Sequence, residues 1–572
     1  MATTISVNKK TIREFLENAQ KQKFLIPEYQ RPYAWEFDHI KTLFDDLVEF
    51  TKKKITQKSQ ENYFLGTVVY FVNKDNQKEI IDGQQRITSL LLLLRAIYKK
   101  LSKSEIKSEK GDNFIKIIEP LIWEQDELSG KANKNSILMN SKVILDKQNQ
   151  IFHEILKTGE ISQNAKDNYS KNYKEFENLY DDFLNNNSDP DAIYIFINNI
   201  LNYTIIMPIE ADTQDTALTI FSTLNDRGMP LSDADIFKAQ IYSDLNDSQK
   251  AEFIKKWQEL ENKTKEANEK MQNLFYVYMF YLRAKNEDKL TTTPKLRTYM
   301  SENEFANLKD ENLLQNLEQI LNLLKFSKNL KDIDCEIWSK NLKIKQAFSL
   351  LTLTNNEWWK YPCVIYYLTH KQNQNFESLF LKFLRKLFVS IFQRYSIEHA
   401  INSLKNPILK LNIEILNSLE PKFDFKEITD NEQYVLEAKI KNPHTNLRYA
   451  LVSFIAYTDE NQKGLLPINW ELEHIFPQKW QKVYIEQTLN WTDEKLKELL
   501  WNIGNLIPLE KKLNIVASNG YFDKKKDEYT KSKVAMTNEI AKNYNDWKPE
   551  NIIERNAELL AQIKSKFTKW LQ

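Results

Sequence analysis

The stretch from Leu465 to Asn514 constrains the fold more than any other part of the chain, because it joins two short apolar runs that both lead into polar residues. The first run, Leu465 to Glu473, predicts a β-strand that ends at His474. Pro477 stops this strand, since proline lacks the backbone N–H that a sheet ladder requires. A histidine is therefore expected at a strand end, beside an acidic residue.

The second run, from Trp501 to Leu509, predicts a return strand. Gly504 lies inside this run at an expected bend, and the polar residues that follow predict the start of a helix near Asn514. Two strands, with an acidic residue and a histidine at the end of the first, followed by an asparagine near a helix start, are the layout of a ββα-metal site.

These residue types fit the hydrolysis of a phosphodiester. In-line attack by water needs a base that takes a proton and a divalent ion that stabilises the leaving oxygen. His474 suits the base, because neutral imidazole titrates near working pH. Glu473 and Asn514 offer oxygen ligands for Mg²⁺ (or Mn²⁺). Asn505 is expected to hold the loop that carries His474 through hydrogen bonds from its side chain.

A second motif, Lys78 to Leu90, predicts a strand, a tight Asp82-Gly83 turn and a long apolar helix. Free backbone N–H groups and the positive end of the helix dipole meet at such a turn, and both favour a phosphate. Arg86 adds a forked donor, and Arg31 can reach the same place from an extended, proline-containing segment. A turn with Arg86 salt-bridged at a domain surface explains the same residues, so the motif alone leaves both roles open.

Composition narrows the class of protein. At 572 residues the chain is too long for one core, and roughly two to four domains are expected. The net charge of +1 excludes a global basic field, so any nucleic-acid surface has to be a local patch. Two cysteines are too few for a disulfide framework. The N-terminus lacks an apolar signal core and no apolar run reaches membrane length, so a cytoplasmic protein without a membrane association is expected.

Several motifs occur in order along the last quarter of the chain: His474-Ile-Phe-Pro-Gln, Gly504-Asn505-Leu506, Asn514, and Lys524-Lys525 followed by Tyr529. Together they resemble the HNH nuclease domain of the GmrSD family, type IV restriction enzymes that cut modified DNA. The resemblance implies that His474 is the general base, Asn514 a metal ligand and Asn505 the brace of the active-site loop. Neighbouring residues of a strand point to opposite faces, so Glu473 can bind the same metal only if the strand twists at its end.

Lys524 and Lys525 lie on a predicted basic helix after these motifs. Their position suits contacts to the phosphate backbone of nucleic acid, without readout of sequence. Acidic residues interleave with the lysines of this helix, which is also typical of a solvated helix face. The pattern leaves both interpretations open.

Three further motifs lie in the front part of the chain: Tyr29-Gln30-Arg31-Pro32-Tyr33, Asp82-Gly83-Gln84-Gln85-Arg86, and Phe221-Ser222-Thr223-Leu224-Asn225-Asp226-Arg227-Gly228. They resemble the ParB/sulfiredoxin-like N-terminal domain of GmrSD enzymes, a nucleotide-handling module whose state controls the nuclease. The resemblance implies that Gln84, Gln85 and Arg86 contact the phosphates of a bound nucleotide, with Arg31 and Gly83 beside them. It also implies that Asp82 polarises a water or a metal. It also implies that Asn225 and Arg227 close the nucleotide pocket.

The predicted fold is multidomain and predominantly α, with α+β parts. Residues 1–240 are expected to form the ParB-like α+β nucleotide-binding domain, residues 241–440 a helical connector, and residues 441–572 the ββα-metal (HNH) nuclease domain. Long stretches of helical apolar spacing in the middle region support the connector.

The predicted function is a nucleotide-regulated, divalent-metal-dependent DNA endonuclease with NTPase activity, directed at modified phage DNA. The expected cofactors are Mg²⁺ or Mn²⁺ and a nucleoside triphosphate of unknown base, the expected partner is double-stranded DNA, and a homo-oligomer is left open. Two alternatives are also open: a nucleotide-sensing DNA-binding protein with an inactive nuclease domain, and an RNA-directed HNH nuclease.

Overall fold

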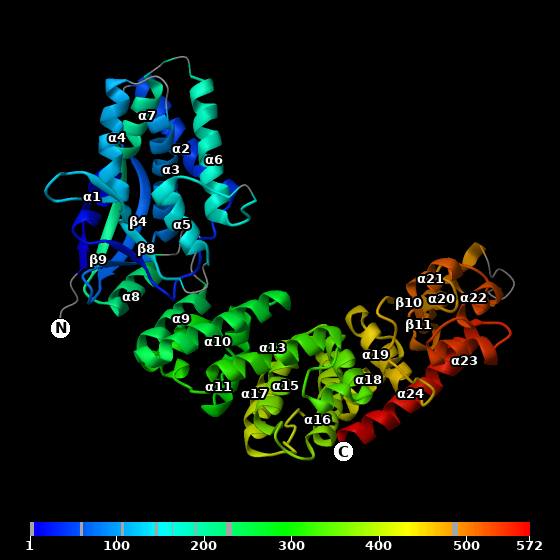
Figure 1. The fold of residues 1–572 in the computed structure, drawn as a ribbon. Coiled ribbons are helices and arrows are strands. Elements are labelled where there is room, and N and C mark those ends of the chain that lie inside the picture. Colours follow the sequence, from blue (N-terminus) through cyan, green and yellow to red (C-terminus); the bar gives the residue numbers. More distant parts are fainter. Residues whose placement is uncertain are drawn as a thin grey trace. The chain divides into compact units, whose positions relative to one another are not determined.

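The computed structural model describes residues 5–57, 61–103, 108–143, 147–162, 164–187, 189, 191–224, 232–482 and 490–572. The chain forms two compact units, Met1–Glu259 and Leu260–Gln572. Helices dominate both units, and a mixed sheet lies in the first (Figure 1). The predicted class, multidomain and mainly helical with some mixed sheet, is therefore confirmed.

The sheet of the first unit has the strand order β1-β9-β4-β5-β3-β8, with β2 paired to β9. Its strands are β1 (Ile5–Val7), β2 (Lys10–Thr11), β3 (Phe24–Ile26), β4 (Tyr63–Val72), β5 (Lys78–Asp82), β8 (Met139–Ser141) and β9 (Thr204–Ala211). The central strand β4 pairs in parallel with β9 and antiparallel with β5. A separate hairpin joins β6 (Trp123–Gln125) to β7 (Ala132–Ile137).

Alternation of side chains along the strands gives this sheet a core on each face. Val68 and Tyr70 of β4 belong to the larger core, whereas Val69 and Phe71 belong to the smaller one. The helices of the larger core are α1 (Ile12–Glu17), α2 (Phe37–Gln57), α3 (Gln84–Lys103), α4 (Glu109–Ile122), α5 (Lys147–Thr158), α6 (Asn168–Asn185) and α7 (Ala192–Asn202). Helices α8 (Gln214–Leu224) and α9 (Asp233–Asp244) contribute to the smaller core.

The predicted strand-turn-helix motif is present in the first unit. Strand β5 ends at Asp82, and α3 begins at Gln84. Gly83 between them has a φ of 93°, and a Cβ at this position would lie 2.7 Å from the side chain of Val68. Both the backbone conformation and the close packing therefore require glycine in the turn.

The second unit opens with helices that bury broad aromatic and aliphatic faces. These helices are α11 (Met271–Lys285), α12 (Leu296–Phe305), α13 (Leu313–Asn329), α14 (Leu342–Thr352), α15 (Lys360–His370), α16 (Phe376–Glu398), α17 (Asn402–Asn417), α18 (Asp430–Lys441) and α19 (Thr445–Thr458). Helix α10 (Asp247–Glu266) contains the boundary between the units. Arg394 of α16 is buried and ion-paired with Glu398 and Glu432.

The last part of the second unit carries the residues predicted for catalysis. Its elements are β10 (Trp470–His474), α20 (Asp493–Leu500), the 3₁₀ turn η7 (Ile503–Asn505), β11 (Leu506–Glu510), α21 (Lys511–Ala517), α22 (Phe522–Tyr529), α23 (Ala535–Asn543) and α24 (Pro549–Leu571). Helix α24 packs against η7 and also against α16, α18 and α20. The predicted boundary at residue 440 lies inside this unit, so the separation of a connector from a nuclease domain stays a prediction.

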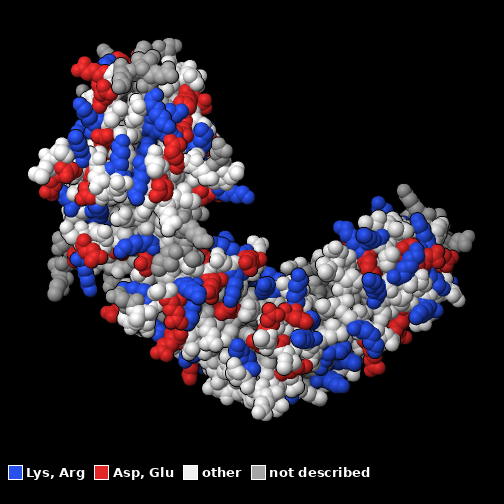
Figure 2. All heavy atoms as spheres, viewed as in Figure 1, with Lys and Arg blue, Asp and Glu red and all other residues white. Residues whose placement is uncertain are grey.

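The surface has no dominant charge on the face drawn in Figure 2, where Lys and Arg lie among Asp and Glu over the described surface. This distribution agrees with the net charge of +1. Within the described residues, no helix is both long and apolar enough to cross a membrane.

Candidate nuclease site

The hairpin that carries the predicted catalytic histidine is antiparallel and regular. Trp470 pairs with Glu510 at one end, and His474 pairs with Leu506 at the other. The strand β10 is shorter than the predicted run from Leu465, but it ends at the expected histidine. Helix α21 follows β11 directly and packs against both strands. The sequence therefore folds locally as strand, strand and helix, in the predicted order.

The imidazole of His474 is buried near the surface end of the hairpin, with 6% of the residue exposed. Its ring meets the ring of Trp501 edge-on at 4.4 Å, and the Gln478 side-chain amide lies 3.1 Å from Nδ1 and 3.4 Å from Nε2. Burial, with smaller contributions from the cations Lys525 and Arg448, lowers the pKa of His474 to about 4. The ring is therefore neutral near pH 7, as a general base requires.

Asn505 binds the loop that follows His474. Its Oδ1 accepts hydrogen bonds from the Phe476 N–H at 2.7 Å and from Trp547 Nε1 at 3.3 Å, and its Nδ2 donates to the Phe476 carbonyl at 3.1 Å. The Asn505 carbonyl accepts from the Ile475 N–H at 2.9 Å. Asn505 is fully buried. The side chain thus satisfies both backbone groups of Phe476, and this geometry is the one that a loop brace needs.

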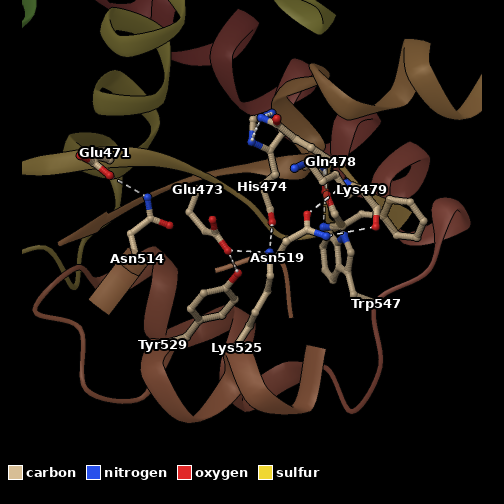
Figure 3. Close-up of polar contacts among 12 residues, drawn as sticks. Glu471, Glu473, His474, Gln478, Lys479, Asn514, Asn519, Lys525, Tyr529 and Trp547 are labelled. Atoms are coloured by element: carbon tan, nitrogen blue, oxygen red, sulfur yellow. Dashed lines mark hydrogen bonds and ion pairs between the residues drawn. The ribbon is translucent and has the colours of Figure 1, made fainter. Parts of the chain in front are cut away.

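Two further groups that sequence reasoning missed also fix this region. Asn519 accepts a hydrogen bond from the Lys479 N–H and donates to the Lys479 carbonyl, both at 3.0 Å, so it holds the same loop one turn further on (Figure 3). Arg555 of α24 donates from Nη1 to the Gly504 carbonyl at 2.6 Å. Neither contact has a sequence signal, because the partners lie tens of residues apart.

The structure gives Glu473, a predicted metal ligand, partners inside the domain, and its metal role stays a prediction. Its Oε1 lies 2.7 Å from Lys525 Nζ and accepts a hydrogen bond of 2.8 Å from the Tyr529 hydroxyl. All three residues are buried, Glu473 with 5% exposed. The carboxylate is therefore committed to an internal ion pair, because leaving the Lys525 ammonium unpaired in the interior is costly.

The prediction that Lys525 contacts DNA phosphates is corrected by the same contacts. Lys525 is 1% exposed, and its ammonium binds Glu473 and the carbonyl of His474. Its neighbour Lys524 is exposed on α22. Helix α22 thus turns one of the two lysines inward and one outward, and only Lys524 remains available for phosphate. The spacing of Lys525 and Tyr529 by four residues, which places them on one helix face, was a signal for the inward role.

Asn514 lies on α21 and donates from Nδ2 to Glu471 Oε2 at 2.9 Å. Glu471 also lies 3.5 Å from Lys511 Nζ, and its side chain is 38% exposed. Among the described residues, no group of three or more His, Cys, Asp or Glu side chains could hold a metal. One or two protein oxygens beside water and phosphate suffice for Mg²⁺, and the Glu471–Asn514 pair supplies those.

His474 and Asn514 are not brought together in this arrangement. Figure 3 shows the imidazole on the opposite side of β10 from the Asn514 amide and the Glu473 carboxylate. The alternation of side chains along a strand accounts for this, since Glu471 and Glu473 share one face and His474 takes the other. The predicted meeting of the His474 base and the Asn514 ligand around one cation is therefore absent from this arrangement of the hairpin (Figure 3).

In the first unit, Arg86 and Asp82 flank the Gly83 turn. Arg86 Nη2 lies 3.3 Å from Asp82 Oδ2, and Nη1 donates to the Leu65 carbonyl at 3.1 Å. Burial raises the pKa of Asp82, and Arg86, the Gly83 N–H and Arg31 oppose that rise. Both side chains are about one quarter exposed. The guanidinium is thus bound to Asp82 and to a carbonyl, and the Asp82 carboxylate accepts from the Gly83 N–H. These contacts match the salt-bridged turn that the sequence left open, and the phosphate site at this turn stays a prediction.

The structure gives Gln84 and Gln85 a role other than the predicted phosphate contact. The Gln85 Oε1 accepts hydrogen bonds from the N–H groups of Ala34 and Trp35, at 2.8 and 3.3 Å. The Gln84 Nε2 donates to Gln30 Oε1 at 3.1 Å. Both amides are buried and hold the extended segment that contains Arg31. Their side chains fasten this segment to α3, and the predicted phosphate contact stays a prediction.

Arg31 lines a small pocket that also touches Gln84, Gln85 and Tyr33. The space between these side chains is too narrow to admit even a water molecule, so it does not form a ligand cavity in this structure. The Arg31 Nε is buried and has no hydrogen-bond partner among the residues that the structure describes. The predicted pocket residues Asn225 and Arg227 lie outside the described residues.

Two family models match this chain, and both describe a restriction endonuclease. Residues 12–242 match the GmrSD restriction endonuclease N-terminal domain, and residues 422–562 match the C-terminal domain of the same enzymes. The chain therefore belongs to the GmrSD restriction endonuclease family, as its motifs predicted. The C-terminal match contains both the β10–β11 hairpin and α21.

A curated relative is similar to part of the chain. The uncharacterized protein MJ0686 of Methanocaldococcus jannaschii is 24% identical over 259 residues. The similarity covers 42% of this chain and 42% of that protein, so the chain spans less than half of the relative's length.

Proposed function

We propose that this restriction endonuclease cleaves DNA with an HNH-type site in the β10–β11–α21 region, with His474 as general base. The observation that carries the proposal is the loop after His474, which Asn505 fixes through both backbone groups of Phe476. A base has to be held within hydrogen-bond reach of the attacking water, and rigid backbone around it provides that. The region lies inside the C-terminal family match.

In this proposal each residue of the site has a separate role. His474 is neutral because burial lowers its pKa to about 4, and its imidazole takes the proton of the attacking water. The Gln478 amide lies beside the ring nitrogens and orients the ring. A divalent ion, when bound, would stabilise the charge that develops on the leaving oxygen. Asn514 and Glu471 are the oxygen-bearing side chains that would hold it. They lie on the other face of β10 from the imidazole (Figure 3), so the proposal requires the end of β10 to twist when metal and DNA bind.

Lys524 and the nucleotide module complete the proposal. Lys524 is exposed on α22, and we assign it a contact to the DNA backbone, which predicts weaker binding at higher salt. The Gly83 turn, Arg86 and Arg31 are assigned to the phosphates of a regulatory nucleoside triphosphate, with Asp82 beside them. The substrate class is modified phage DNA, by analogy with the type IV enzymes that the motifs resemble.

The separation of His474 from Asn514 favours a second candidate function, a DNA-binding protein whose hairpin does not cleave. One assay separates the two. Purified protein is incubated with Mg²⁺ or Mn²⁺, a panel of nucleoside triphosphates, modified and plain phage DNA, and labelled RNA. Strand breaks in DNA support the nuclease. Tight DNA binding without breaks under any ion would establish the second candidate, and breaks in RNA alone would redirect the substrate.

Replacement of Arg86 by alanine tests the nucleotide site. The change removes a guanidinium that binds Asp82 and the Leu65 carbonyl at the head of α3. Loss of a charge-assisted contact of this kind costs about 1.5–3 kcal/mol, so nucleotide affinity is expected to fall roughly 10- to 100-fold. Isothermal titration calorimetry with each triphosphate measures the change.

The matched control is Arg13→Ala, which removes an exposed arginine that pairs with Glu17 on α1 of the same unit. Its nucleotide affinity is expected to equal that of the unmodified chain. Equal affinities for the Arg86 and Arg13 variants would refute the phosphate role of Arg86.

A further inference from the structure

The ammonium of Lys525 is enclosed between two groups of the catalytic strand. It lies 2.7 Å from Glu473 Oε1 and donates to the carbonyl of His474 at 2.5 Å. Lys525 is 1% exposed, and burial lowers its pKa, whereas Glu473 opposes that change. A buried lysine is retained as a cation when a carboxylate and a carbonyl replace its water, and both are present here.

The Glu473 carboxylate is itself held in place. The hydroxyl of Tyr529, one turn after Lys525 on α22, donates to the same Oε1 at 2.8 Å. Tyr529 is fully buried. Lysine has a flexible stem and no preferred fork geometry, so a fixed carboxylate is what determines where its ammonium sits. The Tyr529–Glu473–Lys525 cluster therefore holds the Lys525 ammonium in a fixed position beside the end of β10 (Figure 3).

The backbone at His474 is consequently clamped from two sides. Lys525 binds the His474 carbonyl from α22, and Asn505 binds the N–H groups of the next two residues, Ile475 and Phe476, from η7. A lysine that only neutralised Glu473 would have no need to reach this carbonyl. The second bond ties the ion pair to the residue whose side chain is presented to substrate.

We propose that Lys525 is a positioning residue of the cleavage reaction, which through the His474 carbonyl sets the backbone that aims the imidazole. The inference rests on the proposed function, because it presumes that His474 is the base. It replaces the phosphate contact predicted for Lys525 with a role inside the domain. Lys525 does not touch DNA, so its removal changes the rate of cleavage and leaves DNA affinity alone.

The test uses the full-length protein and a set of matched variants. Lys525→Met alone leaves Glu473 buried without its cation and is prone to unfolding. The double variant Lys525→Met/Glu473→Gln removes both charges, and the glutamine that it introduces retains an acceptor for Tyr529. Glu473→Gln alone keeps the bond from Lys525 to the His474 carbonyl. Lys564→Met, which breaks an exposed pair with Glu437, is the control for loss of a lysine.

The double variant is expected to stay folded and to lose kcat by roughly 100-fold, since a small misplacement of a catalytic group costs about that much. Its KM for DNA is expected to remain unchanged. The double variant is also expected to lose more of its kcat than the single variant Glu473→Gln does. Lys524→Met is expected to show the reverse split, with a raised KM and a normal kcat. Hydrogen exchange at the Ile475 and Phe476 amides, which does not depend on activity, is expected to accelerate in the double variant alone.

The outcomes distinguish the two proposals. Unchanged kcat and unchanged exchange in the double variant, with an active unmodified enzyme, would overturn the positioning role and leave the proposed function standing. An unmodified enzyme and a Lys564→Met variant that both fail to cleave refute the proposed function, and the positioning role falls with it. A raised KM in the double variant would restore the phosphate contact and overturn the inference.

Discussion

Replacement of His474 by alanine is expected to lower the rate of DNA cleavage by about 10²- to 10⁴-fold, the range that a general base contributes. Burial lowers the pKa of the imidazole to about 4, so the unmodified enzyme holds a neutral base at working pH. Alanine removes this base and leaves the backbone contacts of the loop in place, because Asn505 binds main-chain groups of Phe476. Single-turnover cleavage of a labelled duplex measures the change.

DNA binding and the fold are expected to survive the same substitution, and both need to be measured beside the rate. The matched control is His399→Asn, which changes an exposed histidine at the C-terminal end of α16. His399 has a φ of 47°, a conformation that asparagine tolerates better than most residues that carry a side chain. Normal cleavage by this control together with loss in His474→Ala supports the assignment. Normal cleavage by both would remove His474 from the site.

Local patterning was sufficient to predict many elements of the first unit. The aromatic and β-branched run Tyr63–Val72 coincides with β4, because alternation and side-chain shape act within the strand itself. Ser232 caps α9 and Asp235 completes a capping box, a pattern that the sequence displays because both partners lie within four residues. The turn at Gly83 followed from the same kind of short-range signal. Contacts between residues a few positions apart can therefore be predicted from the local sequence.

The candidate site was predictable in its residues but not in its contacts. The position of His474 at a strand end and of Asn505 at a turn followed from motif order. The partner of Lys525 did not, because the His474 carbonyl that it binds is 51 residues away. Glu473 takes the face that strand alternation gives it, opposite His474, and the twist that would bring the two side chains together is absent (Figure 3). No pattern in the sequence indicated that the side-chain amides of Gln84 and Gln85 would form hydrogen bonds with the segment before α2.

The predicted bend at Gly504 has a tertiary cause that only the structure shows. A Cβ on residue 504 would lie 2.2 Å from the Ile552 carbonyl oxygen and 2.9 Å from the Asn556 N. Real Cβ atoms essentially never approach backbone atoms of a helix so closely, so η7 and α24 pack in contact only through glycine. Arg555 of the same helix donates to the Gly504 carbonyl, and this bond depends on the same approach.

Gly504→Ala is therefore expected to push η7 away from α24 and to destabilise the β10–β11 region by about 3 kcal/mol, the upper part of the range for overpacking. The loop that carries His474 depends on the neighbouring Asn505, so cleavage is expected to fall with stability. Hydrogen exchange across residues 500–510 gives the local opening free energy, which is the appropriate quantity because a chain of two units need not unfold in one step.

Gly464→Ala provides the matched control for this substitution. A Cβ at residue 464 meets no atom within 4 Å, and this glycine lies in the same unit, before β10. Its replacement is expected to leave the local opening free energy unchanged or slightly higher, because alanine restricts the unfolded chain. Equal opening free energies for the two alanine variants would contradict the close packing of η7 on α24. They would also remove the bond from Arg555 as a support of the loop that carries His474.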